Sequence, residues 1–173
     1  MPKHLRRYTG QGQLHFITFC CYQRRALLGR ATARTLTMKI LGEVRDRYGF
    51  ALIGYVLMPE HVHLLMSEAP GTSPAKVVQV FKQRVARRLR GKSRAAKGQL
   101  ALRFVEDGEL RRFWQRRYYD FNVYSEKKLR EKLDYMHANP VKEKLVSHPR
   151  EWPWSSWAHY HGGESLLAMD AWR

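Results

Sequence analysis

Two apolar segments separated by a two-residue turn constrain the fold more than any other feature of this sequence. Residues 50–58 and 61–67 are rich in large apolar residues, and each is short enough to be a single strand. Pro59 and Glu60 lie between them and leave space only for a tight turn. The two segments are therefore predicted to form an antiparallel hairpin, to which the other elements must be added.

The second strand of this hairpin carries two histidines one residue apart, His61 and His63. Side chains alternate between the two faces of a strand, so both imidazoles point to the same face. The opposite face takes the apolar residues Val62, Leu64 and Met66. Two imidazoles on one face can bind a divalent metal ion together. The alternative is that they are polar residues on the solvated face of a sheet.

The order of the predicted elements indicates an α+β fold. The hydrophobic pattern predicts a strand at 13–22, a helix at 31–48, the hairpin, a helix at 76–90, a strand at 118–124 and a helix from 125 to about 138. This order matches a ferredoxin-like (split βαβ) antiparallel sheet with helices on one face, followed by a C-terminal helix that carries Tyr135. No repeat or break in composition appears, so residues 1–173 are predicted to form one domain, with a core at about 7–140 and an aromatic tail at 141–173.

The charge of the chain predicts a nucleic-acid partner. It has 32 Lys and Arg residues against 15 Asp and Glu, which gives a formal net charge of +17. The helix at 76–90 contains basic but no acidic residues, and the segment at 110–121 interleaves arginine with aromatic residues that can stack on unpaired bases. A turn-rich lead-in at 1–12 and a predicted loop at 91–108 are also basic. The predicted DNA-binding residues are Lys82, Arg84, Arg87, Arg88, Arg116 and Arg117 of the helix and the aromatic segment, together with Lys128 and Lys132 of the C-terminal helix. The alternative for the helix is an ordinary solvated face.

Two other classes of protein are disfavoured. No apolar run reaches the roughly 18 residues that a membrane-spanning helix requires. The basic residues near the N-terminus are not followed by the apolar segment of a signal peptide, so we expect a cytoplasmic protein with no membrane partner. Cys20 and Cys21 are adjacent, which disfavours a disulfide between them, and we expect reduced thiols.

The predicted C-terminal helix carries a tyrosine outside its own apolar stripe. That stripe consists of Leu129, Leu133 and Met136. Tyr135 and Asn139 fall one turn apart on a neighbouring face, flanked by Lys128 and Lys132. A phenol in that position is available for chemistry, and the lysines could favour its deprotonated form. The alternative is a surface tyrosine of an amphipathic helix.

His15, in the first predicted strand, could line a site beside the histidine pair.

Four short motifs occur in order along the chain. They are YVLMPEHVHLL at 55–65, FWQRRYYD at 113–120, DYMHANPVK at 134–142 and WPWSS at 152–156. Together they resemble the motifs of the HUH single-tyrosine transposases, and most of all those of the REP-associated branch. Any one of these motifs is weakly specific, whereas four in this order favour a functional over a structural interpretation of the two histidines.

The resemblance implies a role for each matching residue. His61, His63 and Asn139 would form a site for Mg²⁺ or Mn²⁺, ions that suit mixed nitrogen and oxygen ligands. Tyr135 would be the nucleophile. Its rivals are the two tyrosines of the preceding predicted strand, Tyr118 and Tyr119.

The activity implied by the resemblance is that of a metal-dependent single-stranded DNA nickase and strand transferase. It would act on hairpin (REP-type) DNA through a 5′-phosphotyrosine intermediate. A monomer that completes its site within one chain is favoured, and a homodimer is the alternative. Two other hypotheses remain open: a non-catalytic nucleic-acid-binding module on a ferredoxin-like sheet, and a metal-dependent hydrolase that uses activated water.

Overall fold

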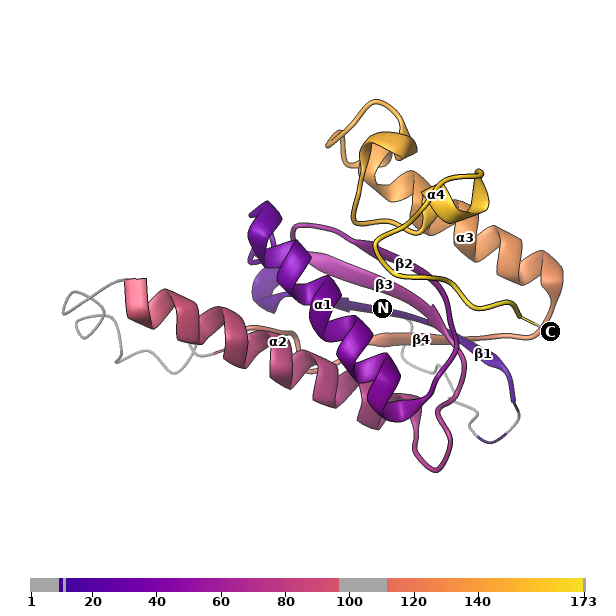
Figure 1. Ribbon diagram of the computed structural model, residues 1–173, viewed down its shortest axis with the longest axis horizontal. Coiled ribbons are helices and arrows are strands. Elements are labelled where there is room, and N and C mark those ends of the chain that lie inside the picture. The colour runs from indigo at the N-terminus through magenta and orange to yellow at the C-terminus, as the bar shows by residue number, and fades with distance from the viewer. Residues whose placement is uncertain (1–9, 11, 97–111, 173) are drawn as a thin grey trace.

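A four-stranded antiparallel sheet forms the centre of the molecule (Figure 1). The computed structural model describes residues 10, 12–96 and 112–172. The strands are β1 (Leu14–Cys20), β2 (Leu52–Leu57), β3 (His61–Met66) and β4 (Tyr119–Val123). Their spatial order is β2-β3-β1-β4, and every neighbouring pair is antiparallel. The predicted hairpin is confirmed, because β2 and β3 pair directly across the short turn.

Helices cover both faces of the sheet (Figure 1). On one face lie α1 (Ala31–Tyr48) and α2 (Pro74–Ala96), which pack against each other and share one hydrophobic core with the sheet. On the other face α3 (Glu126–Lys142) contributes to a second core. The remaining short helices are η1 (Tyr22–Arg24), η3 (Pro149–Glu151) and α4 (Trp157–Tyr160). The predicted ferredoxin-like architecture is confirmed, with the tyrosine-bearing helix on the face opposite the other two long helices.

The alternation of side chains along the strands separates the two cores. In β1, Ile17 and Phe19 face α1 and α2, whereas Leu14 and Phe16 belong to the core under α3. The central strand β3 is buried along its whole length. One set of its side chains, Val62, Leu64 and Met66, enters the α1–α2 core. The other set includes both histidines, which therefore lie on the face covered by α3.

Two helices extend beyond their predicted ends. The α3 helix was expected to end near residue 138, because Pro140 disfavours helical geometry in the residue before it. It continues to Lys142, since Pro140 lies close to the end of the helix and both it and Asn139 are buried. The α2 helix continues to Ala96 and takes in the first six residues of the predicted loop at 91–108. The rest of that segment and most of the lead-in at 1–12 lie outside the described residues.

The aromatic tail packs along the exposed edge of β2. The backbone amides of Leu57 and Ser156 donate to the carbonyl oxygens of Trp154 and Tyr55, both at 2.9 Å. The guanidinium of Arg34 lies 3.9 Å from the centre of the Trp154 ring. The tail thus covers one of the two sheet edges. None of the helices in the described part of the chain is both long and apolar enough to cross a membrane.

Candidate active site

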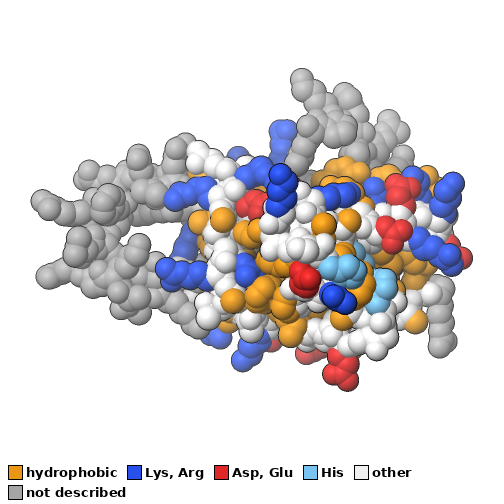
Figure 2. All heavy atoms as spheres, turned by 90° about the horizontal axis from the view of Figure 1, so that it is seen from above, with side chains coloured by type: hydrophobic (Ala, Val, Ile, Leu, Met, Phe, Trp, Pro, Cys, Tyr) orange, Lys and Arg blue, Asp and Glu red, His pale blue; other side chains and the backbone are white. Residues whose placement is uncertain are grey.

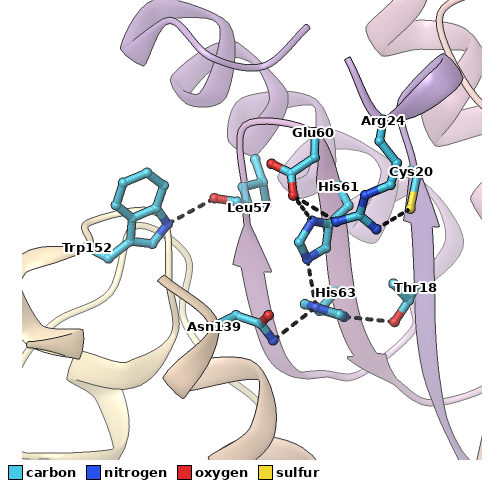
Figure 3. Close-up of polar contacts among 9 residues, drawn as sticks. All are labelled: Thr18, Cys20, Arg24, Leu57, Glu60, His61, His63, Asn139 and Trp152. Atoms are coloured by element: carbon cyan, nitrogen blue, oxygen red, sulfur yellow. Dashed lines mark hydrogen bonds and ion pairs between the residues drawn. The ribbon is translucent and has the colours of Figure 1, made fainter. Parts of the chain in front are cut away.

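The two histidines of β3 converge on one point beneath α3 (Figure 3). His61 and His63 are 4% and 2% exposed. Their Nε2 atoms lie 3.0 Å apart, and the two rings are nearly perpendicular. Burial of two imidazoles with their nitrogens facing each other is unfavourable unless a proton or a metal cation lies between them. This geometry favours a site over two incidental surface histidines.

The outer nitrogen of each imidazole is held by a neighbouring oxygen. Glu60 Oε1 lies 2.7 Å from His61 Nδ1, and Thr18 Oγ1 lies 2.7 Å from His63 Nδ1. When each Nδ1–H donates to its oxygen, each Nε2 keeps the lone pair that a metal ion requires. The hydrogen bond from His61 holds the pKa of Glu60 below its usual value, although burial opposes this. Burial, together with nearby positive charge, lowers the pKa of His63 well below its usual value, which favours its neutral form.

The third predicted ligand, Asn139, reaches the pair from α3. Its Nδ2 lies 3.2 Å from His63 Nε2, and the same nitrogen lies 3.2 Å from the carbonyl oxygen of Tyr135. A half-turn of the amide exchanges Nδ2 for Oδ1, so the side chain can present an oxygen to the pair. In the described part of the chain no three His, Cys, Asp or Glu side chains are grouped for a metal ion, so an amide oxygen is the third ligand that the geometry offers.

The residues present fit a divalent ion. Two nitrogen ligands at right angles, each about 2.1 Å from a metal, are separated by about 3 Å. The observed separation of the Nε2 atoms, 3.0 Å, matches this value. Two imidazoles and one amide oxygen also leave positions open for other oxygen ligands, which suits Mg²⁺ or Mn²⁺ better than a closed structural zinc site.

Tyr135 lies beside this cluster within the same chain. Its ring centre is 5.7 Å from that of His63 and 6.1 Å from that of Phe16, in edge-on contacts. Tyr135 is 47% exposed, so its phenol is accessible from outside. The structure therefore brings together all four residues that the resemblance singled out.

The rival tyrosines occupy different positions. Tyr119 is on the same face of the sheet and makes an edge-on contact with Phe16, 6.4 Å between ring centres. Burial raises the pKa of Tyr119, and its proximity to Tyr135 adds to this effect. Tyr118 lines a cavity beside α2. Of the three tyrosines, Tyr135 is the one whose ring packs against His63.

The lysines around Tyr135 differ from those expected. Lys128 forms an ion pair with Glu131 at 2.6 Å, so its ammonium group is already engaged. Lys132 lies 5.2 Å above the Phe16 ring, on which Tyr135 also packs, and burial lowers its pKa. Lys142, which the sequence reasoning did not single out, lies 5.0 Å above the ring of Tyr135 itself. Of these three lysines, Lys142 is the one that lies over the ring of Tyr135.

The predicted DNA-binding residues of α2 and of the segment before β4 have mixed surroundings. Lys82 donates to the carbonyl oxygen of Gln115 at 2.7 Å, and burial lowers its pKa. Arg84 forms an ion pair with Glu43. The remaining four are exposed, and they are Arg87, Arg88, Arg116 and Arg117. Lys82 and Arg84 thus have structural contacts, whereas the other four are open to a ligand. On the side of the molecule that carries α3 and α4, Figure 2 shows further lysine and arginine side chains spread over the surface.

His15 does not belong to the site. It points to the face of α1 and α2, where it is fully buried. Its Nδ1 lies 2.8 Å from Asp120 and its Nε2 lies 3.4 Å from Glu68. Burial alone would lower the pKa of His15, but these two carboxylates raise it above the usual value. The expectation that His15 lines the site beside the histidine pair is wrong, because alternation in β1 places it on the opposite face.

Comparison with known proteins identifies the family. The family model for IS200-like transposases matches residues 9–139, a range that contains His61, His63, Tyr135 and Asn139. The chain belongs to the IS200-like transposase family. Within the family, the REP-associated tyrosine transposase of Escherichia coli K12 is 27% identical over 167 residues, which cover 95% of this transposase and 88% of that protein.

Two further comparisons agree with this assignment. A provisionally named REP-associated tyrosine transposase of Haemophilus influenzae is 29% identical over 113 residues. That alignment spans 64% of this chain and 61% of the relative. A solved structure of a REP-associated tyrosine transposase bound to a REP hairpin superposes with a TM-score of 0.69 at 22% identity, covering 98% of this chain and 93% of that one. The resemblance to REP-associated tyrosine transposases is confirmed, and the likeness to the solved structure confirms the fold.

Proposed function

We propose that this transposase is a metal-dependent single-stranded DNA nickase and strand transferase that works through a 5′-phosphotyrosine intermediate. The observation that carries the proposal is the contact of the Tyr135 ring with His63, in a cluster that Asn139 completes. An exposed candidate nucleophile and a buried candidate metal-ligand set are thereby in contact. Phosphodiester cleavage requires this combination of an aligned nucleophile and stabilised phosphoryl charge.

The chemistry assigns a task to each part of the site. The phenol oxygen of Tyr135 attacks the scissile phosphorus and loses its proton, while the bond from phosphorus to the 3′ oxygen breaks and that oxygen takes up a proton. The products are a 5′-phosphotyrosine and a free 3′-OH. Attack by a 3′-OH on the phosphotyrosine reverses the step or joins a new strand, and it releases the tyrosine. A bound Mg²⁺ or Mn²⁺ would supply Lewis-acid stabilisation of charge on the phosphoryl oxygens.

Side chains around the cluster prepare it for this reaction. Thr18 and Glu60 fix the orientation and tautomer of the two imidazoles. Lys142, 5.0 Å above the Tyr135 ring, places a cation beside the proposed nucleophile, where it can contact a phosphate of the bound strand. Because Tyr135 and His63 belong to one chain, the site can be completed in a monomer, as expected from the motif resemblance.

We infer that the substrate is single-stranded hairpin DNA of the REP type. The solved relative is bound to a REP hairpin, and both curated relatives carry names that associate them with REP sequences. The formal charge of +17 on this chain suits a polyanionic partner of that kind.

A cleavage assay tests this proposal. Wild-type protein is incubated with a labelled single-stranded hairpin oligonucleotide, in Mn²⁺ or in EDTA, and the products are separated on a denaturing gel. We expect cleavage in Mn²⁺ by the wild type and by Tyr119→Phe, and none by Tyr135→Phe or in EDTA. Cleavage by Tyr135→Phe at the wild-type rate would exclude the tyrosine mechanism and favour activated water. Tight binding without cleavage of any REP-type hairpin would favour a non-catalytic binding module.

A further inference from the structure

A cleft rich in arginine lies next to the histidine pair, at the end of β1. The cleft has a volume of about 460 Å³, in the size range of ligand-binding pockets. Nine residues line it, of which four are arginines and none is acidic. Those on which the argument depends are Arg24, Arg112, Arg116, Arg117, Tyr22 and Trp114. The sequence predicted DNA binding by Arg116 and Arg117, and Arg112 belongs to the same basic and aromatic segment, but the sequence did not point to Arg24 or to the cleft.

The walls of this cleft are held by backbone hydrogen bonds. The amide of Gln115 donates to the carbonyl oxygen of Cys20, and the amide of Tyr22 donates to that of Phe113, both at 2.9 Å. The indole of Trp114 donates to the carbonyl oxygen of Lys82, also at 2.9 Å. A cleft that is fixed in this way loses little conformational entropy when a ligand binds.

The arginines of the cleft form a cluster of positive charge. Arg112, Arg116 and Arg117 are exposed, and the described part of the chain provides no ion pair for any of them. The guanidinium of Arg112 lies 5.8 Å above the ring of Tyr22. Like charges gathered around one cleft repel each other, and a bound polyanion relieves this repulsion. Aromatic side chains beside arginines also provide surfaces on which an unpaired base can stack.

Arg24 connects the cleft to the histidine pair (Figure 3). Its Nη2 lies 3.2 Å from Glu60 Oε1, and the same oxygen lies 2.7 Å from His61 Nδ1. Arg24 and the preceding Gln23 both have a φ of +52°, a left-handed conformation that costs energy in residues other than glycine. Strain of this kind occurs often at functional sites. In this protein the strained turn carries Arg24, which both lines the cleft and contacts Glu60.

Resting on the proposed function, we propose that this cleft binds a short unpaired segment of the DNA strand beside the metal site. Its phosphates contact Arg112, Arg116 and Arg117, and a base packs against the aromatic wall. Arg24 contacts the strand where the cleft meets the Glu60–His61 pair, which leads the backbone towards Tyr135. Four cations exceed what one phosphate ion would require, and a cleft of this size with aromatic residues in its lining favours an unpaired strand over a duplex.

Binding of a short fluorescein-labelled oligodeoxythymidylate, which forms no hairpin, tests the proposal without metal or catalysis. Fluorescence anisotropy in EDTA gives its affinity over a range of NaCl concentrations. Each phosphate contact to a single strand contributes about 0.7 to the slope of log K against log salt. We expect the double variant Arg112→Gln/Arg117→Gln to reduce the magnitude of that slope by about 1.4, and the single variant Arg24→Gln to reduce it by about 0.7. Arg116 is left intact because it also lines the neighbouring cavity beside α2.

The matched control is Arg47→Gln, an exposed arginine in the last turn of α1, at the end of the sheet away from the cleft, which should keep the wild-type slope. Thermal melting by circular dichroism confirms that each variant is folded. A folded double variant with the wild-type affinity and slope would overturn the proposal. Inorganic phosphate that competes as well per phosphate as the oligonucleotide would also overturn it, because the cleft would then be a site for single anions. A duplex of the same sequence that binds as tightly would refute the preference for an unpaired strand.

The hairpin cleavage assay separates this proposal from the proposed function. If the wild type forms a Tyr135 adduct but the cleft variants bind the oligonucleotide normally, the cleft proposal fails alone. If the cleft variants lose binding but no adduct forms with any REP-type hairpin, the proposed function fails and the cleft remains a strand-binding site.

Discussion

Replacement of Thr18 by valine is the most informative single change near the histidine pair. Thr18 lies opposite His63 in the β1–β3 register, and its Oγ1 is 2.7 Å from His63 Nδ1. Valine has nearly the same shape but lacks the hydroxyl. The change therefore removes the acceptor that keeps the proton of His63 on Nδ1, and it leaves the rest of the sheet in place.

The expected loss of metal affinity follows from the tautomer of His63. Without an acceptor at Nδ1, the ring is free to carry its proton on Nε2, where it blocks metal binding. Removal of such an outer partner costs about 10- to 100-fold in metal affinity, equivalent to about 1.4–2.7 kcal/mol. Folding stability should fall as well, by about 1–3 kcal/mol, because His63 is 2% exposed and its Nδ1 would have no partner.

Titration calorimetry with Mn²⁺ measures this effect, with Thr18→Ser as the matched control because it keeps the hydroxyl. We expect Thr18→Ser to bind Mn²⁺ within a few-fold of the wild type and Thr18→Val to bind about 10- to 100-fold more weakly. Nitrogen NMR of the imidazoles reports the tautomer directly. A Thr18→Val protein that binds Mn²⁺ as tightly as Thr18→Ser would refute the claim that this hydroxyl prepares His63 for a metal.

Three further predictions concern stability. Mn²⁺ at about 100 times its dissociation constant should stabilise the folded protein by about 2.7 kcal/mol, seen as a rise in melting temperature that His61→Ala abolishes; an equal rise in that variant would place the ion elsewhere. Burial lowers the pKa of His137 to about 4 from an ordinary 6.5, so its neutral form is favoured in the fold. The free energy of unfolding therefore has its full value above pH 6.5 and decreases by about 3 kcal/mol as the pH falls towards 4. Denaturant melts should show this slope in the wild type but not in His137→Gln, and parallel pH profiles would contradict the assignment. A Cβ on Gly54 would lie 2.7 Å from Leu133 Cδ2 and 3.3 Å from Met136 Cε, so Gly54→Ala should cost about 1 kcal/mol by pushing on α3; an unchanged urea midpoint would show that these side chains move aside freely.

The fold was largely predictable because its elements have strong hydrophobic periodicities. The helix at 31–48 was predicted with the bounds that the structure shows, and the hairpin followed from its two-residue turn. The placement of α3 on the face of the sheet opposite α1 and α2 was harder to predict. Because β1 is apolar on both faces, its pattern alone does not show which helix covers which face. Burial of Asn139 and Pro140 by tertiary packing extended α3 past the point where local geometry favoured its end.

The residues proposed to form the site could be identified from the sequence, whereas the residues that contact and support them could not. Thr18 contacts His63 only because of the strand register, which the hydrophobic pattern did not fix. Lys142 was missed because the helix was expected to end before Pro140. In a continuous helix it lies seven residues after Tyr135 and therefore on the same face. Arg24 depends on a left-handed turn at non-glycine residues, for which the sequence gives no signal.

The central claim is that Tyr135 becomes covalently attached to DNA in a reaction that requires the histidine cluster. The most direct test is mass spectrometry of the peptides of a trapped protein–DNA adduct, formed on a REP-type single-stranded hairpin in Mn²⁺. We predict that the nucleotide mass is found on the peptide that contains Tyr135, and that no adduct forms in EDTA or with His63→Ala. Attachment at Tyr118 or Tyr119, or an adduct of undiminished yield in His63→Ala, would contradict it.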